Sequence, residues 1–379
     1  MDPDVVEIPP PIHQTPSRFK KQKQTVFHDV IDLEGDDDLL VLGETSRKRR
    51  NKGKAVVSPG LTTITDEPEN ETLKKLRSFK QFETVVDISD HHYVTNNSSM
   101  KQNPKSWAKK IQDEWKILEK HLPETIYVRV FESRMDLLRA VIIGAEGTPY
   151  QDGLFFFDVL FPSGYPNVPP QVHYHAGGLR LNPNLYGNGN VCLSLLNTWS
   201  GSRNEKWTPG VSTMLQVLVS IQGLILNAKP YFNEPGYAST SGTQNGEAQS
   251  LKYNENTFIL SVRTMMYTMK KPPKNFEDLV AGHFYSRAHD ILASCKAYME
   301  GVQVGCLVKG GVQDVDEDGG KSSDKFKADL LKYVKLLVKE FEKLGVKDCK
   351  KFISPTPTPL KLTTPKPTPS KLRTTRGKK

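Results

Sequence analysis

Four short segments rich in proline, glycine and asparagine decide the fold of this chain of 379 residues. In order they are Tyr165-Pro-Asn-Val-Pro-Pro170, Asn182-Pro-Asn184, Gly189-Asn-Val-Cys192-Leu193 and Trp207-Thr-Pro209. Proline fixes the backbone angle φ, and glycine and asparagine adopt turn conformations that other residues avoid, so these segments predict a series of tight turns. Cys192 directly follows one of them, which predicts a sharply bent and exposed backbone beside its thiol.

The sequence before these turns predicts an antiparallel sheet. Segments rich in β-branched and aromatic residues occur at 126–130, 137–143, 154–160 and 172–174. Parallel strands need crossovers of a dozen or more residues, so neighbours this close predict a four-stranded antiparallel meander. The apolar spacing from Trp107 to Leu122 predicts a helix, ended by Pro123, that covers one face. The expected fold class is therefore α+β.

Helical spacing returns after Cys192. Helices are expected over 214–225, 248–269, 276–299 and 324–344. The whole chain then divides into a disordered arm (1–103), a folded domain with a helical extension (104–300), a glycine-rich acidic linker (301–323), an amphipathic helix (324–345) and a proline-rich basic disordered tail (346–379). The sequence leaves open whether the last helix packs on the domain or on a partner.

The positive charge of the chain belongs to its tail. Lys and Arg number 52 against 43 Asp and Glu, a formal charge of +9, and residues 350–379 hold nine basic and no acidic side chains. The remainder has no net charge, which argues against nucleic acid as a partner. The longest apolar stretch, 154–161, falls far below the roughly 18 residues that span a bilayer, and no signal peptide follows Met1. We expect a soluble intracellular protein that does not bind membranes.

The cysteines point to one reactive thiol. They are Cys192, Cys295, Cys306 and Cys349, too few and too far apart for a disulfide framework or a metal site. Free cysteine is usually buried and inert. Cys295 lies in a helical pattern, and Cys306 and Cys349 lie in sequence expected to be flexible, so we expect all three thiols to be inert. Cys192, after its turn, is the candidate nucleophile.

Together the ordered segments resemble the catalytic domain of the ubiquitin-conjugating enzymes. That family has a Tyr-Pro-x-x-Pro-Pro segment, a His-Pro-Asn tripeptide, a cysteine eight residues after its asparagine, a Trp-Ser-Pro segment and a long helix. Here Asn184 and Cys192 have the same spacing, and the other segments follow in order. The resemblance covers residues 104–240 and, less closely, extends to residue 300. It implies the UBC fold, a four-stranded meander flanked by helices.

The resemblance also implies an activity. Cys192 would accept the C-terminal carboxyl of ubiquitin from an activating enzyme as a thioester and pass it to a lysine amine of a protein substrate. A thiolate attacks thioesters and is also a good leaving group, so one cysteine serves both steps. Asn184 would stabilise an oxyanion or support the turn, and Glu234 would orient the lysine or be a solvated acid. No cofactor is implied, because the activating enzyme uses the ATP.

Three differences from the family pattern matter. Asn182 replaces the histidine of His-Pro-Asn, whose role in the family is mainly structural. Cys192 and Trp207 are separated by a longer interval than in compact members, with an insert at 198–206. Asn167 occupies a ligase-contacting position that is apolar in many members. The insert and the Asn-Pro-Asn tripeptide resemble the large hybrid enzymes that combine conjugating and ligase activities, so the need for a separate RING-type ligase stays open.

Three other interpretations stay open. The chain could conjugate a different ubiquitin-like modifier. It could be a non-catalytic ubiquitin-binding module on the same fold, against which the presence of Cys192 argues. It could also be a cysteine hydrolase. The candidate bases for that hydrolase are His173, His175, His283 and His289. None of them has a recognisable sequence signature around it.

The N-terminal arm carries two kinds of short motif. Three tetrads have the order apolar, apolar, acid, apolar, at Val5–Ile8, Val30–Leu33 and Val85–Ile88. They resemble segments that bind the modifier SUMO by adding a strand to its sheet, and the strongest candidate consists of Val30, Ile31, Asp32 and Leu33. A basic run resembles a nuclear-localisation signal and consists of Arg47, Lys48, Arg49 and Arg50. We therefore expect a nuclear or cytoplasmic protein, or one found in both; chance tetrads and a solvated charge run are the alternatives.

Overall fold

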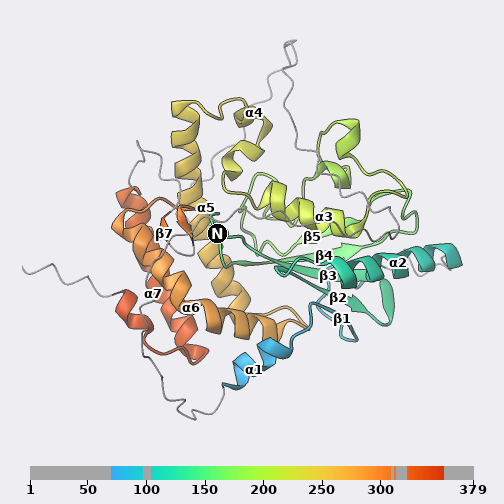
Figure 1. Cartoon of the computed structure of the whole chain (residues 1–379), viewed down its shortest axis with the longest axis horizontal. Coiled ribbons are helices and arrows are strands. Elements are labelled where there is room, and N and C mark those ends of the chain that lie inside the picture. Colours follow the sequence, from blue (N-terminus) through green and yellow to red (C-terminus); the bar gives the residue numbers. More distant parts are fainter. Residues whose placement is uncertain (1–69, 97–103, 309–310, 313–321, 354–379) are drawn as a thin grey trace, which may run out of the picture. The chain divides into compact units, whose positions relative to one another are not determined.

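The computed structural model describes residues 70–96, 104–308, 311–312 and 322–353 (Figure 1). Several predicted features lie outside these ranges: the tetrads Val5–Ile8 and Val30–Leu33, the basic run Arg47–Arg50 and the tail beyond residue 353. Among the described residues, no helix has the length and apolar character needed to cross a membrane.

A five-stranded sheet forms the centre of the described fold. Its strands lie side by side in chain order as β1 (Phe82–Val85), β2 (Ile126–Phe131), β3 (Arg134–Ile143), β4 (Leu154–Leu160) and β5 (Gln171–Tyr174). Strands β2 to β5 form the predicted antiparallel meander. The α+β class is confirmed. The sheet gains one strand that the sequence did not predict, β1, which pairs parallel to β2.

The prediction of a disordered arm over 1–103 is wrong for residues 70–96. Helix α1 (Glu71–Ser78) begins at Asn70, whose side-chain oxygen accepts a hydrogen bond from the Thr72 N–H at 2.8 Å. Strand β1 follows. Elements of 8 and 4 residues are too short to show a clear periodicity, and they are stabilised mainly by tertiary packing.

The third SUMO-like tetrad belongs to this folded segment. Val85 and Ile88 pack with Tyr93 against a buried apolar patch on the sheet. The Asp87 carboxylate accepts a hydrogen bond from the Ser89 N–H at 2.9 Å. Two of the tetrad's apolar side chains are thus committed to the protein's own core, so Val85–Ile88 is not a free modifier-binding segment.

Both faces of the sheet are covered. One face packs on α2 (Lys105–His121) and α3 (Met214–Ser220), around core residues such as Ile111 and Leu218. The other face packs on α5 (Gln244–Lys270), α6 (Glu277–Glu300) and α7 (Asp324–Lys343), which lie side by side in Figure 1. Layers on both sides explain why all seven side chains of β4 are buried.

Helix α7 answers the question that the sequence left open. Its apolar stripe is buried against α5 and α6, and the fully buried members are Leu330, Val334, Leu337 and Phe341. The helix therefore packs on the protein's own domain. It begins at Ser323, whose hydroxyl accepts a hydrogen bond from the Phe326 N–H at 3.2 Å.

The predicted linker (301–323) and tail (346–379) are partly folded, contrary to prediction. Val304 is buried, and β6 (Leu307–Val308) pairs antiparallel with β7 (Gly311–Val312). A 3-10 helix at Cys349–Phe352 buries Cys349 against the α6–α7 layer. These short segments gain their order from apolar contacts with that layer, which their glycine-rich or basic sequence does not reveal.

The remaining short elements surround the turn that carries Cys192. They are 3-10 helices at Ser194–Leu196, Arg203–Glu205 and Pro230–Asn233, a π-helical turn at Ile221–Ile225 that continues α3, and α4 (Pro235–Ala238). The sequence predicted one continuous helix over 214–225, whereas the structure has an α-helix followed by this π-turn.

Candidate active site

Cys192 and Asn184 clamp their loop together. The Cys192 N–H donates to the Asn184 carbonyl, and the Asn184 side-chain amide donates back to the Cys192 carbonyl, each at 2.9 Å. Asn184 is buried, whereas Cys192 is half-buried. This reciprocal pair gives Asn184 a geometric role in supporting the loop. A role on an oxyanion stays a prediction.

Asn182 fixes the loop to the rest of the domain. Its fully buried side chain donates to the Tyr150 hydroxyl and to the Ile225 carbonyl, both at 2.7 Å. Its side-chain oxygen accepts from the Asn184 N–H at 2.8 Å. Asn182 therefore ties the β3–β4 connection, the end of the π-turn and the cysteine loop together. This is the structural role expected of the residue that replaces the histidine.

Glu234 joins the same neighbourhood. It lies half-buried between the 3-10 helix Pro230–Asn233 and α4. The preceding Asn233 donates to the Ile225 carbonyl at 3.1 Å and lies 3.4 Å from the Asn182 side-chain oxygen. The Glu234 charge acts on the Cys192 thiol. The structure thus brings together all three predicted residues, Cys192, Asn184 and Glu234.

Two side chains beside the thiol were not predicted. Tyr186 is hydrogen-bonded to Cys192 through its hydroxyl, and the Arg180 guanidinium lies over the Tyr186 ring, 4.6 Å from its centroid. Burial raises the pKa of Cys192 above its ordinary value, and the Glu234 carboxylate raises it further. The Tyr186 hydrogen bond and the Arg180 charge oppose that rise. The thiol form therefore predominates at neutral pH, and loading requires removal of its proton.

The insert 198–206 packs back on the cysteine loop. The Thr198 hydroxyl donates to the Val191 carbonyl at 2.7 Å and accepts from the Leu193 N–H at 3.0 Å. These bonds bracket Cys192. In the downstream part of the insert, Ser202 and Glu205 form a capping box around the 3-10 helix. The insert 198–206 is therefore an ordered segment beside the Cys192 loop.

The Tyr-Pro-x-x-Pro-Pro segment and Trp207 also meet. The Trp207 indole N–H donates to the Pro166 carbonyl at 2.7 Å, and its ring lies 5.5 Å from that of Tyr165. The Tyr165–Pro166 peptide bond is cis. Asn167, two residues after Tyr165, is exposed, as its proposed contact with a partner requires.

The four histidines weighed as hydrolytic bases have other partners. His283 and His289 bond the carbonyls of Asp152 and Lys347, both at 2.9 Å. His175 lies 2.9 Å from Asp158, and His173 stacks on His92. Among the described residues, no histidine acts on the pKa of Cys192. The site therefore lacks the cysteine–histidine pair that the hydrolase interpretation needs.

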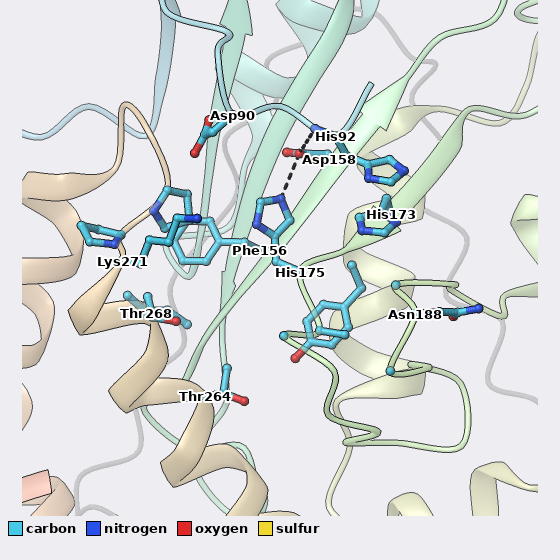
Figure 2. A pocket seen from close by; sticks show the side chains of 18 residues that line it. Asp90, His92, Phe156, Asp158, His173, His175, Asn188, Thr264, Thr268 and Lys271 are labelled. Atoms are coloured by element: carbon cyan, nitrogen blue, oxygen red, sulfur yellow. Dashed lines mark hydrogen bonds and ion pairs between the residues drawn. The ribbon is translucent and has the colours of Figure 1, made fainter. Parts of the chain in front are cut away.

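His173 and His175 instead line a cavity of about 420 Å³ behind the cysteine loop. Figure 2 shows His175 and the His92 backbone turned toward Asp158, which Arg139 also binds at 2.6 and 2.9 Å. The described residues contain no group of three His, Cys, Asp or Glu side chains arranged to hold a metal ion. Arg139, His175 and the His92 N–H instead surround the buried Asp158 carboxylate and stabilise its negative charge.

His173 also supports the loop before Cys192. Gly189 has φ of +90°, and a Cβ added there would overlap the His173 imidazole ring. The His173 ring stacks on His92 from the segment 70–96, with centroids 3.4 Å apart and planes at 3°. The N-terminal segment therefore reaches the cysteine loop through one stacked pair.

Comparison with known proteins decides the family. The family model described as "Ubiquitin-conjugating enzyme" matches residues 110–266. Ubiquitin-conjugating enzyme E2 38 of Arabidopsis thaliana is 60% identical over 273 residues, covering 72% of this chain and 84% of that protein. This chain belongs to the ubiquitin-conjugating enzyme family. Its match with E2 26 of the same plant is 57% identical, over 77% of this chain and 54% of that protein. The chain thus spans about half the length of that relative.

The hybrid subgroup is among the relatives. The dual E2 ubiquitin-conjugating enzyme/E3 ubiquitin-protein ligase BIRC6 of Homo sapiens is 35% identical over 302 residues, 75% of this chain but 6% of that much longer protein. The predicted resemblance to the family, and within it to the large hybrid enzymes, is therefore confirmed.

Proposed function

We propose that this ubiquitin-conjugating enzyme homologue carries ubiquitin as a thioester on Cys192 and transfers it to lysine amines of protein substrates. The observation that carries the proposal is the loop closed by two hydrogen bonds between Asn184 and the Cys192 backbone, which presents a half-buried thiol on which the Glu234 charge acts. Its partners would be ubiquitin, the ubiquitin-activating enzyme and the substrates. No cofactor is needed on this chain, since the activating enzyme consumes the ATP.

The first step is a thioester exchange. Cys192 loses its proton, and its sulfur attacks the carbonyl carbon that links ubiquitin to the activating enzyme's cysteine. The tetrahedral intermediate expels that enzyme's thiolate, leaving ubiquitin on Cys192. The Tyr186 hydroxyl and the Arg180 charge favour the attacking thiolate, because both lower the pKa of Cys192.

The second step is aminolysis. A neutral lysine amine attacks the same carbonyl carbon, the Cys192 thiolate leaves, and the amine loses a proton as the isopeptide bond forms. The Glu234 carboxylate is suited to accept a hydrogen bond from the amine and so orient it. Asn184 keeps the loop in place during both steps, and its amide, which donates to the Cys192 carbonyl, is a candidate donor for the oxyanion.

We also propose that transfer proceeds without a separate RING-type ligase. The dual conjugating enzyme/ligase BIRC6 is a relative, the ligase-contacting position holds the exposed polar residue Asn167, and the insert 198–206 forms an ordered wall beside Cys192. Substrate ubiquitination by the purified chain with only activating enzyme, ATP and ubiquitin would support this. An absolute requirement for an added ligase would contradict it.

Two further proposals concern the sequence outside the described residues. The basic run Arg47–Arg50 would direct nuclear import, and Val30–Leu33 would bind SUMO. Replacing the four basic residues with alanine should move a fluorescent fusion out of the nucleus. Titrating residues 1–100 with SUMO should shift the NMR signals of Val30–Leu33; unshifted signals would remove that proposal.

The experiment that tests the main function is a loading assay. Incubation with activating enzyme, ATP and ubiquitin should give a thiol-sensitive adduct that is absent from Cys192→Ala, and Cys192→Ser should give a thiol-resistant ester. Cys306→Ser is the matched control, since Cys306 is also half-buried and should leave the adduct intact. An adduct formed only with another modifier would establish the alternative conjugation activity. No adduct with any modifier would refute the enzymatic proposal.

A further inference from the structure

Two uncompensated charges of opposite sign flank Cys192. Glu234 and Arg180 both act on the pKa of its thiol, the first raising it and the second lowering it. Among the described residues, neither side chain forms an ion pair, and Arg180 contacts only the face of the Tyr186 ring through its charge. Arg180 is exposed and Glu234 is half-buried. The two charges are therefore available to a bound partner.

Tyrosine side chains extend this site on the Glu234 side. Tyr231 stacks on Tyr237, with centroids 4.4 Å apart and planes at 5°, and its ring also lies 6.0 Å from that of Tyr253. Burial raises the pKa of Tyr253, and the charges of Arg180 and Glu234 act on it in opposite directions. Tyr231 and Tyr237 belong to the two short helices on either side of Glu234, so their stacked rings lie beside that carboxylate in the fold. Tyrosines supply large and rigid contact area for a polypeptide.

We propose that Arg180 makes this site selective for acceptor lysines that have an acidic side chain close by in the substrate. The inference rests on the proposed function, because it concerns the second, aminolysis step. The acceptor amine must reach the carbonyl carbon on Cys192, where Glu234 meets the lysine. Arg180 then lies one tyrosine ring away from the thiol, in reach of a neighbouring residue of the same substrate.

The chemistry of arginine determines which neighbour fits. Its planar guanidinium pairs with a carboxylate through two parallel hydrogen bonds. An extended substrate advances about 3.3–3.6 Å per residue, so three residues on either side of the acceptor lysine span about 10 Å in each direction, and the selected Asp or Glu is sought there. A basic neighbour would meet repulsion instead. The tyrosines would contact the substrate without distinguishing its charge.

The exposure of Arg180 determines how strong the preference for an acidic neighbour is. Arg180 is exposed, so its ion pair with the substrate is screened by water. Pairs of this kind change rates or affinities by about two- to fivefold. The preference should also weaken as salt is added, because screening acts strongly on exposed charges.

The test is single-turnover discharge of the full chain loaded with ubiquitin, after activation has been stopped. Peptides with one lysine carry Glu, Gln or Arg at each of the three positions on either side. Because all peptides meet the same thioester, effects of a variant on the Cys192 thiol cancel in the ratio of rates. We expect a two- to fivefold preference for Glu over Gln at one or more positions. Arg180→Glu should reverse it in favour of Arg.

Two controls separate selectivity from a structural effect. Lys335→Glu makes the same charge change on the exposed side of α7 and should keep the Glu preference. Arg180→Gln should abolish the preference, which is read as the ratio of the Glu-peptide and Gln-peptide rates measured on the same loaded variant. Equal rates for Glu and Gln peptides at every position, or a Glu preference that survives Arg180→Glu, would overturn the inference alone. Absence of any thioester would refute the proposed function itself, and this inference with it.

Discussion

Removing the Asn182 side chain should destabilise the domain and loosen the cysteine loop. Asn182→Ala deletes three short hydrogen bonds from a fully buried position, two donated at 2.7 Å and one accepted at 2.8 Å, and a longer one accepted from Asn233 at 3.4 Å. Each neutral buried hydrogen bond contributes about 1 kcal/mol net, so the three short bonds together predict a loss of about 3 kcal/mol. The partners left buried, including the Ile225 carbonyl, can raise that loss further.

The assay is urea unfolding followed by circular dichroism, with the free energy of unfolding extrapolated to water. Asn188→Ala is the matched control. Asn188 is an exposed asparagine in the same loop, where it accepts one hydrogen bond from the Asn190 N–H at 3.1 Å. Its replacement should cost no more than about 0.5 kcal/mol. At a temperature where both variants are folded, loading with ubiquitin should slow only for Asn182→Ala.

The outcome that refutes this reasoning is equally defined. If Asn182→Ala loses no more stability than Asn188→Ala, the three hydrogen bonds do not hold the loop. If stability falls but loading at low temperature keeps its full rate, the loop does not need Asn182 to present Cys192.

Three other predictions concern the thiol, the turn before it and the last helix. Tyr186→Phe removes a hydrogen bond that lowers the pKa of Cys192, so the pH midpoint of its alkylation by iodoacetamide should move upward; an unchanged midpoint would contradict the contact. Gly189→Ala should cost about 1–3 kcal/mol in thermal unfolding, because φ of +90° is unfavourable and the Cβ meets an imidazole ring; wild-type stability would disprove that close approach. Leu337→Ala, at a fully buried site of α7, should cost about 2–5 kcal/mol, whereas the 46%-exposed Leu336 should lose little when replaced by alanine; equal losses in urea unfolding would mean that α7 does not pack as described.

The sequence predicted the parts of the fold whose side chains repeat regularly. The helices α2, α5, α6 and α7 have long periodic patterns, whereas the four strands of the meander were predicted from their β-branched and aromatic residues between turns; the predicted bounds differ from the observed ones by a few residues. It missed α1 and β1, because 8 and 4 residues carry little pattern and depend on the sheet they pack against. It also missed the break between α3 and the π-turn, which changes hydrogen bonding but not polarity.

The candidate site was predictable where spacing along the chain encodes it. Asn184 and Cys192 are joined by two hydrogen bonds across their eight-residue interval. The spacing seen in the sequence therefore corresponds directly to the hydrogen bonds that close the loop. Arg180 and Tyr186 had no such signal. Their contact depends on how the turn folds back, since residues six apart in a loop have no fixed relation. Tyr186 lies two residues after Asn184, and this proximity was the one available clue.

The extent of the folded unit follows from the two faces of the sheet. The family match, 110–266, contains the meander and the helices of one face. It includes most of α5 but excludes α6 and α7, the rest of the layer on the other face, where Phe156 and Leu154 pack. Strands with apolar side chains on both faces require a cover on each. In this chain, part of the layer that covers the sheet lies outside the family match: residues 70–96 precede the match, and α6 and the elements after it follow it. The stacked His92–His173 pair links residues 70–96 to the cysteine loop. Residues 70–96 and the helices α6 and α7 are therefore part of the structure that holds Cys192.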